Sequence, residues 1–138
     1  MTLPQPPRSR VLITGSRDFD DVEQVRAALN QIRVEFGGPL TIVHGDARGA
    51  DRIARDLTRN VPDALAVDEP HPAQWRAADG STDRSAGHRR NADMVAAGAS
   101  VCLAFYREGA GNRGTAGCVR IARAAAIPVR EFWQRGAP

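Results

Sequence analysis

The sequence predicts an α/β protein with a Rossmann-like, doubly wound parallel sheet of about five strands in the order 3-2-1-4-5. Two observations carry this prediction. Short apolar runs rich in β-formers alternate with segments whose apolar residues recur at helical spacing. Three strand-to-helix junctions also carry glycines beside an arginine. The 138 residues, 42% of them hydrophobic, suit one domain over residues 11–138, preceded by a flexible tail over residues 1–10.

The first strand and its turn organise the chain. An apolar run from Val11 leads into a polar turn, and a helix with apolar spacing follows from Val22 to Phe36. Asp20 or Asp21 can cap that helix, and glycines at 37 and 38 end it. A glycine turn that feeds a helix is a typical anion-binding site, because the helix N-terminus offers free N–H groups. The candidate ligand residues here are Gly15, Ser16, Arg17 and Asp18.

The second junction repeats this arrangement. A strand is expected over residues 40–44, and a helix begins near Ala50. We expect Asp51 to cap that helix, in preference to contacting a ligand, and His44 to be a hydrogen-bonded scaffold residue. The candidate ligand residues of the loop are Gly45, Asp46, Arg48, Gly49 and Asp51.

A short third strand is expected over residues 64–67, followed by a long polar loop over 68–80. Loops of this length in a compact domain are often functional. The loop carries Trp75, which can cover the base of a ligand or seal one end of the core. The sequence favours the core interpretation.

The next helix opens near Ser85 with a basic cluster at residues 88–90. Cations near a helix N-terminus oppose the helix dipole, and such local conflicts tend to mark functional sites. An equally favoured alternative is a solvated surface on a helix that begins earlier, at Thr82 and Asp83. Arg90 and Asn91 are the candidate site residues, with Arg90 the one candidate for an electrostatic catalytic role.

The third glycine-rich junction follows a fourth strand expected over residues 100–105. Thr115 can cap the helix that starts there, and a fifth strand is expected over 128–132 at the sheet edge. The candidate ligand residues are Gly111, Asn112, Arg113, Gly114 and Thr115. If strands 1 and 4 are neighbours, these glycine turns converge on one crevice beyond the strand ends. An anionic, phosphorylated ligand suits such a crevice.

Composition narrows the class of function. All 19 basic residues are arginines, which excludes Schiff-base lysine chemistry and a Walker lysine and favours planar contacts to phosphate. No apolar run approaches the ~18 residues that span a bilayer, and no secretory signal opens the chain, so we expect a cytoplasmic protein without membrane contact. Cys102 and Cys118 lack metal-ligand spacing, so neither a metal nor a cofactor is predicted.

Four motifs in this order carry a family resemblance: GSRDF at 15–19, HGDARGAD at 44–51, AGHRRNADM at 86–94 and GNRGT at 111–115. Together they resemble the YspA/YpsA-related branch of the SLOG superfamily of Rossmann-like nucleotide-binding proteins. The resemblance extends from Val11 to about Phe132 and implies binding of a nucleotide or nucleotide-derived ligand.

The wider superfamily includes the LOG phosphoribohydrolases, which cleave a base from a nucleoside monophosphate. Residues 90–94 resemble their Arg-Lys-x-x-Met motif, with Asn91 in place of lysine. Residues 111–118 resemble their glycine-rich motif, but Cys118 stands where they have glutamate. A thiol cannot replace a carboxylate that stabilises an oxocarbenium ion, so the resemblance implies a phosphate site without implying LOG catalysis.

Three functions follow in order of preference. The first is a binding protein or sensor for a small nucleotide-derived ligand, in which Arg90 and Arg113 hold one anionic group from two sides. The second is an N-glycosidic or phosphoester hydrolase with Asp18, Asp46 or Asp51 as the acid–base group. The third is a single-stranded nucleic-acid module, as in a SLOG branch that handles DNA; an aromatic content of 5% makes it the least favoured. Analogy with related folds suggests a homodimer.

Overall fold

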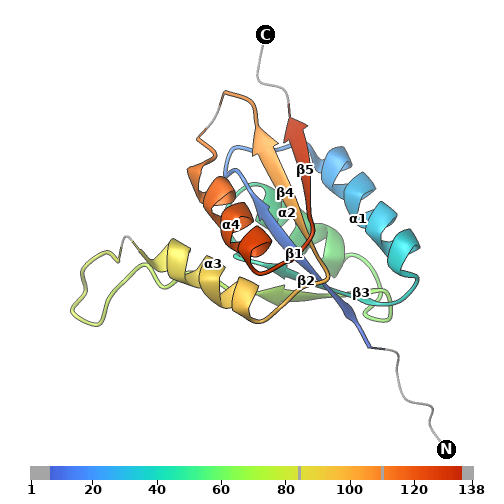
Figure 1. Ribbon diagram of the computed structural model, residues 1–138, viewed down its shortest axis with the longest axis horizontal. Helices are drawn as coiled ribbons and strands as arrows, with labels where there is room; N and C mark the ends of the chain where they lie inside the picture. Colours follow the sequence, from blue (N-terminus) through green and yellow to red (C-terminus); the bar gives the residue numbers. More distant parts are fainter. Residues whose placement is uncertain (1–6, 84, 110, 135–138) are drawn as a thin grey trace, which may run out of the picture.

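The computed structural model describes residues 7–83, 85–109 and 111–134. Five parallel strands form one sheet in the order β3-β2-β1-β4-β5, and helices lie on both of its faces (Figure 1). This confirms the predicted fold and strand order. In chain order the elements are β1 (Ser9–Gly15), α1 (Val22–Phe36), β2 (Leu40–His44), α2 (Ala50–Arg59), β3 (Ala66–Pro70), α3 (Ala86–Ala96), β4 (Val101–Arg107), α4 (Arg113–Ala124) and β5 (Val129–Gln134).

The central pair of strands is β1 and β4, as the glycine junctions predicted. Their register runs in parallel from Val11 opposite Val101 to Gly15 opposite Phe105. On the other side β1 pairs with β2, with Leu12 opposite Val43. The carboxyl ends of all three strands therefore meet at one edge of the sheet, where the connections to α1, α2 and α4 begin.

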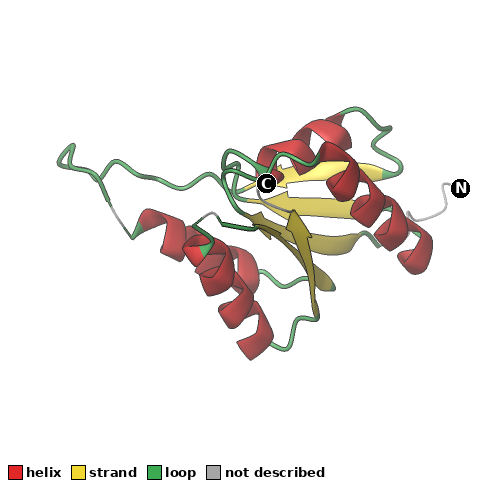
Figure 2. Cartoon of the chain, turned by 90° about the horizontal axis from the view of Figure 1, so that it is seen from above, coloured by secondary structure: helices red, strands yellow, loops and turns green. Residues whose placement is uncertain are grey.

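Two apolar layers cover the sheet (Figure 2). One layer packs α1 and α2, through residues such as Ile32 and Ala54, against a face of the sheet that includes Ile13. The other layer packs α3 and α4, through Met94 and Cys118, against the opposite face. No helix in the described ranges combines the length and apolarity needed to cross a membrane.

The ends of α1 follow the predicted chemistry. The Asp21 carboxylate accepts the backbone N–H of Gln24 at 3.1 Å and caps the first turn. The last turn ends at Gly37, whose φ of 65° is left-handed. A glycine reaches this conformation without the steric cost that a Cβ adds.

The third strand differs from its prediction. It starts at Ala66 and continues through Pro70, beyond the expected residues 64–67. The polar residues Asp68 and Glu69 stay in the strand because both are paired, Asp68 with His44 and Glu69 with Arg10. Apolar periodicity does not detect a strand whose side chains form ion pairs.

The first strand begins at Ser9, two residues inside the segment predicted as a flexible tail. The backbone N–H of Ser9 donates to the carbonyl of Pro39 at 3.0 Å, which draws Ser9 into the sheet. Residues 1–6 of the predicted tail lie outside the described residues.

Candidate functional site

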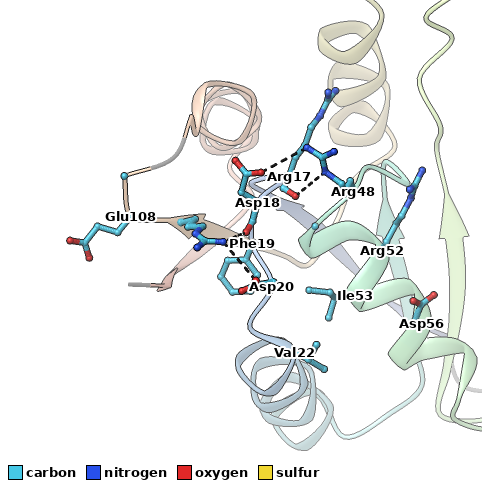
Figure 3. A pocket seen from close by; sticks show the side chains of 13 residues that line it. Arg17, Asp18, Phe19, Asp20, Val22, Arg48, Arg52, Ile53, Asp56 and Glu108 are labelled. Atoms are coloured by element: carbon cyan, nitrogen blue, oxygen red, sulfur yellow. Dashed lines mark hydrogen bonds and ion pairs between the residues drawn. The ribbon is translucent and has the colours of Figure 1, made fainter. Parts of the chain in front are cut away.

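Two hollows lie at the carboxyl edge of the sheet, and they share an arginine wall. The smaller holds about 360 Å³ and the larger about 990 Å³. Ligand pockets in proteins commonly hold about 300–1,000 Å³. Arg17, Arg48 and Arg52 line both. The smaller hollow is lined by Arg17, Gly45, Asp46, Ala47, Arg48, Arg52, Pro72, Ala73, Trp75 and Arg90. The larger is lined by the turn after β1, the start of α2 and the end of β4 (Figure 3).

Two glycines allow the loops around these hollows to approach one another. A Cβ at Gly15 would lie 2.4 Å from the Cβ of Ala50, at the start of α2. Gly49 has a φ of 95°, and a Cβ there would lie 2.2 Å from the carbonyl oxygen of Ser16. Both distances are far below van der Waals contact, so only glycine fits at either position. The first two junctions therefore lie close together, as predicted, because glycine lets their backbones approach.

The turn after β1 divides into a buried anchor and exposed ligand candidates. Ser16 is buried; its N–H donates to the carbonyl of Phe105 at 2.9 Å, and its hydroxyl accepts the N–H of Asp18 at 3.2 Å. Arg17 and Asp18 are exposed. The Arg48 guanidinium bridges the two loops: it donates to the carbonyl of Arg17 at 3.4 Å and lies 3.8 Å from the Asp18 carboxylate (Figure 3).

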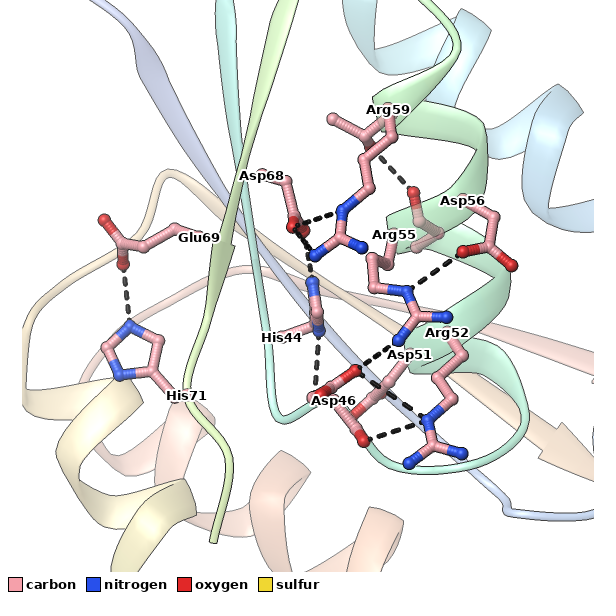
Figure 4. Close-up of polar contacts among 12 residues, drawn as sticks. His44, Asp46, Asp51, Arg52, Arg55, Asp56, Arg59, Asp68, Glu69 and His71 are labelled. Atoms are coloured by element: carbon pink, nitrogen blue, oxygen red, sulfur yellow. Dashed lines mark hydrogen bonds and ion pairs between the residues drawn. The ribbon is translucent and has the colours of Figure 1, made fainter.

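A buried histidine fixes the loop after β2. The His44 side chain is fully buried, and its Nδ1 accepts the backbone N–H of Asp46 at 2.9 Å. Nε2 therefore carries the ring hydrogen and donates it to Asp68, whose carboxylate also pairs with Arg59 at 3.1 Å (Figure 4). His44 is the predicted scaffold residue.

Asp51 does not cap its helix, contrary to the prediction. The N-cap of α2 is Gly49, and Asp51 is the second residue of the helix. Its Oδ2 accepts the N–H groups of Gly45 at 3.0 Å and Ala47 at 3.3 Å, so it shapes the loop that precedes α2. Its Oδ1 is buried and has no hydrogen-bond partner among the described residues. Burial raises the pKa of this carboxyl, against the opposing effect of the Ala47 and Gly45 N–H groups and of the Arg90 charge.

These bonds change the expected mode of anion binding. The backbone N–H groups of Gly45, Asp46 and Ala47 already donate to Asp51 or His44. In the first turn, the N–H groups of Ser16 and Asp18 are likewise paired. A phosphate in the smaller hollow would therefore meet arginine side chains in place of these amides.

The Asp46 carboxylate is neutralised by the next helix. It lies 2.8 Å from Nη1 of Arg55 and 3.7 Å from Nε of Arg52 (Figure 4). Asp46 also has a left-handed φ of 52°, which is uncommon outside glycine and is better tolerated by Asp and Asn than by most residues. The smaller hollow thus keeps its positive character despite this carboxylate.

Arg90 lies in the smaller hollow, where α3 meets the loop after β2. Its Nη1 donates to the carbonyl of Gly45 at 2.6 Å and its Nε to the side-chain oxygen of Asn91 at 2.8 Å. The helix starts at Ala86, so the alternative in which it begins at Thr82 and Asp83 is wrong. Asn91 orients Arg90 through this bond.

The third junction differs more from its prediction. Thr115 is buried inside α4 and is not the cap, which is Asn112. The Asn112 side chain accepts the N–H of Arg107 at 3.2 Å and donates to its carbonyl at 3.0 Å, closing the turn after β4. Gly111, Arg113 and Gly114 are exposed, and Arg113 lies outside the lining of both hollows. Its shared contact with Arg90 on one anion stays a prediction.

Sequence reasoning missed Arg52 and Arg107 and misjudged Trp75. Arg107 ends β4, and its Nη1 donates to the carbonyl of Asp18 at 2.7 Å, so it links the β4 end to the first turn. Its position two residues before a glycine at a strand end was an available signal. The core interpretation of Trp75 is wrong, because its side chain is 43% exposed and lines the smaller hollow.

Cys118 is fully buried, and its burial raises the pKa of the thiol. The position that carries a glutamate in the LOG motif thus holds a neutral packing residue. Among the described residues, no group of three or more His, Cys, Asp or Glu side chains is placed to hold a metal ion.

The family model described as "YspA, cpYpsA-related SLOG family" matches residues 9–77, which include the first two junctions. The Gene 61 protein of Mycobacterium phage D29 is 42% identical over 130 residues, covering 89% of this chain and 95% of that protein.

Among solved structures, DNA processing protein A from Helicobacter pylori, described for its single-stranded DNA binding mode, superposes with a TM-score of 0.60 at 16% identity. The match covers 92% of this chain and 66% of that one, slightly under two thirds of its length. At this identity the likeness shows the shared fold alone.

Proposed function

Because this chain belongs to the YspA/cpYpsA-related SLOG family, we propose that it binds a nucleotide or a nucleotide-derived phosphorylated ligand in the crevice at the carboxyl ends of its strands. It acts there as a ligand sensor or binding protein. The observation that best supports this proposal is the smaller hollow, in which Arg17, Arg48 and Arg90 converge from the ends of β1 and β2 and from α3.

The charge balance of this hollow supports an anionic ligand. Its lining holds four arginines and one carboxylate, that of Asp46, which Arg55 and Arg52 already neutralise. Arginine forks form paired, charge-assisted hydrogen bonds with phosphate oxygens, and each such bond is worth about 1.5–3 kcal/mol. Four guanidinium groups that line one hollow suit a phosphorylated ligand.

Hydrolysis is the weaker candidate. The acid–base group would have to be Asp18, Asp46 or Asp51. Asp46 is ion-paired, and Asp51 lies buried beneath the loop with its Oδ2 committed to two backbone N–H groups. Asp18 is exposed, and its carboxylate lies 3.8 Å from a nitrogen of Arg48. This arrangement supports binding over turnover.

Single-stranded DNA is the second candidate, favoured by the exposed Trp75 beside the arginines and by the fold shared with DNA processing protein A. Exposed aromatics and a positive groove are the two features that non-specific single-strand binders combine. Arg17, Arg48 and Arg52 line both hollows, but the larger hollow also carries the carboxylates of Asp18, Asp20, Asp56 and Glu108, which disfavour a nucleic-acid strand along it.

A thermal-shift screen separates these candidates. The panel comprises AMP, ADP-ribose, NAD, cyclic dinucleotides and a short oligodeoxythymidine. A small ligand at 100 times its Kd stabilises the folded state by about 2.7 kcal/mol, a shift that the melting temperature reports. We expect at least one small nucleotide to stabilise the wild type clearly more than the Arg90→Ala variant at the same ligand concentration.

Arg33→Ala serves as the matched control, because Arg33 lies in the last turn of α1, outside the lining of both hollows, and its side chain bonds only to Asn30 among the described residues. Stabilisation by the oligonucleotide alone, increasing with its length and lost at high salt, would assign the nucleic-acid function instead. No stabilisation by any member of the panel would contradict both.

A further inference from the structure

Trp75 is placed in a way that the packing of the core does not explain. Tryptophan is usually well buried, yet this side chain is 43% exposed and forms part of the wall of the smaller hollow. The guanidinium carbon of Arg17 lies over the indole, 5.4 Å from the ring centroid. The exposed aromatic face is thus covered by a cation from the opposite loop.

The backbone around Trp75 fixes the position of the ring. Its carbonyl accepts the N–H of Asp83, and an antiparallel bridge joins Arg76 to Thr82 directly after it. The segment between β3 and α3 extends away from the sheet (Figure 2), so these local bonds hold Trp75 at its base. The site is therefore built by the chain and is not an incidental surface contact.

Gly87 provides the space in which the indole lies. A Cβ at residue 87 would be 2.9 Å from Cη2 of Trp75, closer than real Cβ contacts. The first turn of α3 therefore accommodates the ring edge only because residue 87 is glycine. The same helix supplies Arg90 to the hollow, so the aromatic ring and the phosphate-binding candidate are positioned by one element.

Of the four arginines that line the smaller hollow, Arg17 has the fewest polar partners among the described residues. Arg48 has the Asp18 carboxylate nearby, Arg52 has Asp46, and Arg90 bonds to Gly45. Among the described residues, the guanidinium of Arg17 has no carboxylate partner, and it lies over the Trp75 ring. A cation over an exposed ring is a weak interaction that a better-fitting planar group can replace.

We propose that the aromatic base of the ligand stacks on Trp75, and that the guanidinium of Arg17 moves off the indole when the base binds. The released guanidinium then pairs with the ligand phosphate at the shared wall. A base covers the ring more completely than a guanidinium, while the guanidinium gains a charge-assisted contact. This inference rests on the proposed function and narrows its ligand class to phosphates that carry a purine or pyrimidine.

Calorimetric titration with AMP and ribose 5-phosphate tests this inference, because the two probes differ by the base. We expect the wild type to bind AMP more tightly. Trp75→Leu should weaken AMP binding about tenfold, the size of one stacking interaction, and leave ribose 5-phosphate binding unchanged. Trp75→Phe, which keeps an aromatic face, should retain most of the AMP affinity. An unchanged melting temperature of Trp75→Leu without ligand excludes a folding defect.

Fluorescence gives an independent readout, because the chain has only two tryptophans. In Trp133→Phe, the emission comes from Trp75 alone and should be quenched by AMP but not by ribose 5-phosphate. In Trp75→Phe, the emission comes from Trp133 on β5, whose ring centroid lies 4.5 Å from that of Tyr106 on β4. AMP should leave this emission unchanged.

The outcomes separate the two proposals. Equal affinity of the wild type for AMP and ribose 5-phosphate, or equal AMP affinity of the wild type and Trp75→Leu, would overturn the stacking role and leave phosphate binding standing. Binding of neither probe by the wild type would overturn the stacking role for this ligand, whereas the proposed nucleotide site is contradicted only if no member of the thermal-shift panel binds.

Discussion

Arg90 donates a hydrogen bond from Nη1 to the carbonyl oxygen of Gly45 across 2.6 Å, which joins α3 to the end of β2. A Cβ at residue 45 would lie 2.2 Å from that same nitrogen. Gly45 therefore leaves the space in which the guanidinium of Arg90 lies in the smaller hollow.

Gly45→Ala should displace Arg90 while leaving the fold intact, because the clash falls on the far end of a flexible side chain. We expect AMP affinity to fall about tenfold, equivalent to 1.4 kcal/mol, by calorimetric titration. Gly38→Ala is the matched control, since a Cβ there has no neighbour within 4 Å. Equal affinities of the two variants would show that Arg90 does not need its observed position.

Arg90→Ala should weaken nucleotide binding about tenfold or more, because it removes a charge-assisted contact worth about 1.5–3 kcal/mol. It also removes the bonds to Gly45 and Asn91, so the ligand-free melting temperature should fall slightly. The control Arg33→Ala should change neither. A large ligand-free destabilisation of Arg90→Ala would make the residue structural.

The sequence pattern predicted the sheet order. It also predicted the bounds of β2 and α1, because each is an apolar segment that ends at a glycine. It failed where polar residues take core-like roles. Asp68 extends β3 through its bonds to His44 and Arg59, which only the neighbouring elements supply. The prediction for Trp75 was wrong for the opposite reason. Its apolar residue type favoured the core, but the position of Trp75 is set by the hairpin that follows it.

The first two glycine junctions predicted that their loops meet, but not which groups they offer, and the candidate residues 111–115 of the third junction line neither hollow. Local reasoning assigned free backbone N–H groups to the loop after β2. Those donors are taken by Asp51 and by His44, a pairing that depends on how the loop folds back over α2. The arginine side chains remain available to a ligand, because they extend beyond the backbone groups that are already hydrogen-bonded.

Cys118→Ala should leave nucleotide binding unchanged and lower the free energy of unfolding by about 1 kcal/mol, the scale of losing one buried group from a packed core. The thiol is fully buried and its raised pKa suppresses the nucleophilic thiolate. Native protein should resist alkylation by iodoacetamide at both buried cysteines, and unfolded protein should react at both. Loss of binding at an unchanged melting temperature would assign Cys118 a functional role.

Glu69→Gln should reduce stability at neutral pH and have little effect near pH 2. The Arg10 guanidinium holds both carboxylate oxygens of Glu69 at 2.7 Å and lowers the pKa of Glu69 to about 2. A lowered folded-state pKa gives stability that is present above the ordinary value of 4.5 and is lost as pH falls toward about 2. Urea unfolding across this range measures the difference, which should be modest because the pair is partly exposed.

Glu108→Gln is the control for that titration, since the exposed Glu108 carboxylate forms no ion pair with a described residue. A stability difference between wild type and Glu69→Gln that does not shrink in acid would mean that the Arg10 pair does not control this titration.

Asp51→Asn should remove a contribution to the pH dependence of stability whose sign is opposite to that of Glu69. Burial raises the pKa of Asp51 above its ordinary value of 3.8, so the folded state binds this proton more tightly than the unfolded state does. The stability that Asp51 gives relative to Asn is therefore greatest at low pH and falls as pH rises from the ordinary carboxyl range through the raised pKa. The asparagine oxygen can still accept the N–H groups of Gly45 and Ala47, while its NH₂ replaces the unbonded Oδ1.

Urea unfolding of the wild type, Asp51→Asn and Asp51→Ala between about pH 4 and pH 7 separates charge from shape. The amide variant should gain on the wild type as pH rises, because it never has to bury a charge. The alanine variant should lose about 1–3 kcal/mol at every pH, because it leaves two buried N–H groups without an acceptor. If the difference between wild type and Asp51→Asn were constant with pH, the carboxyl would titrate alike in both states. Its unbonded oxygen would then have to be satisfied by a solvent molecule or a ligand group that lowers the cost of the charge.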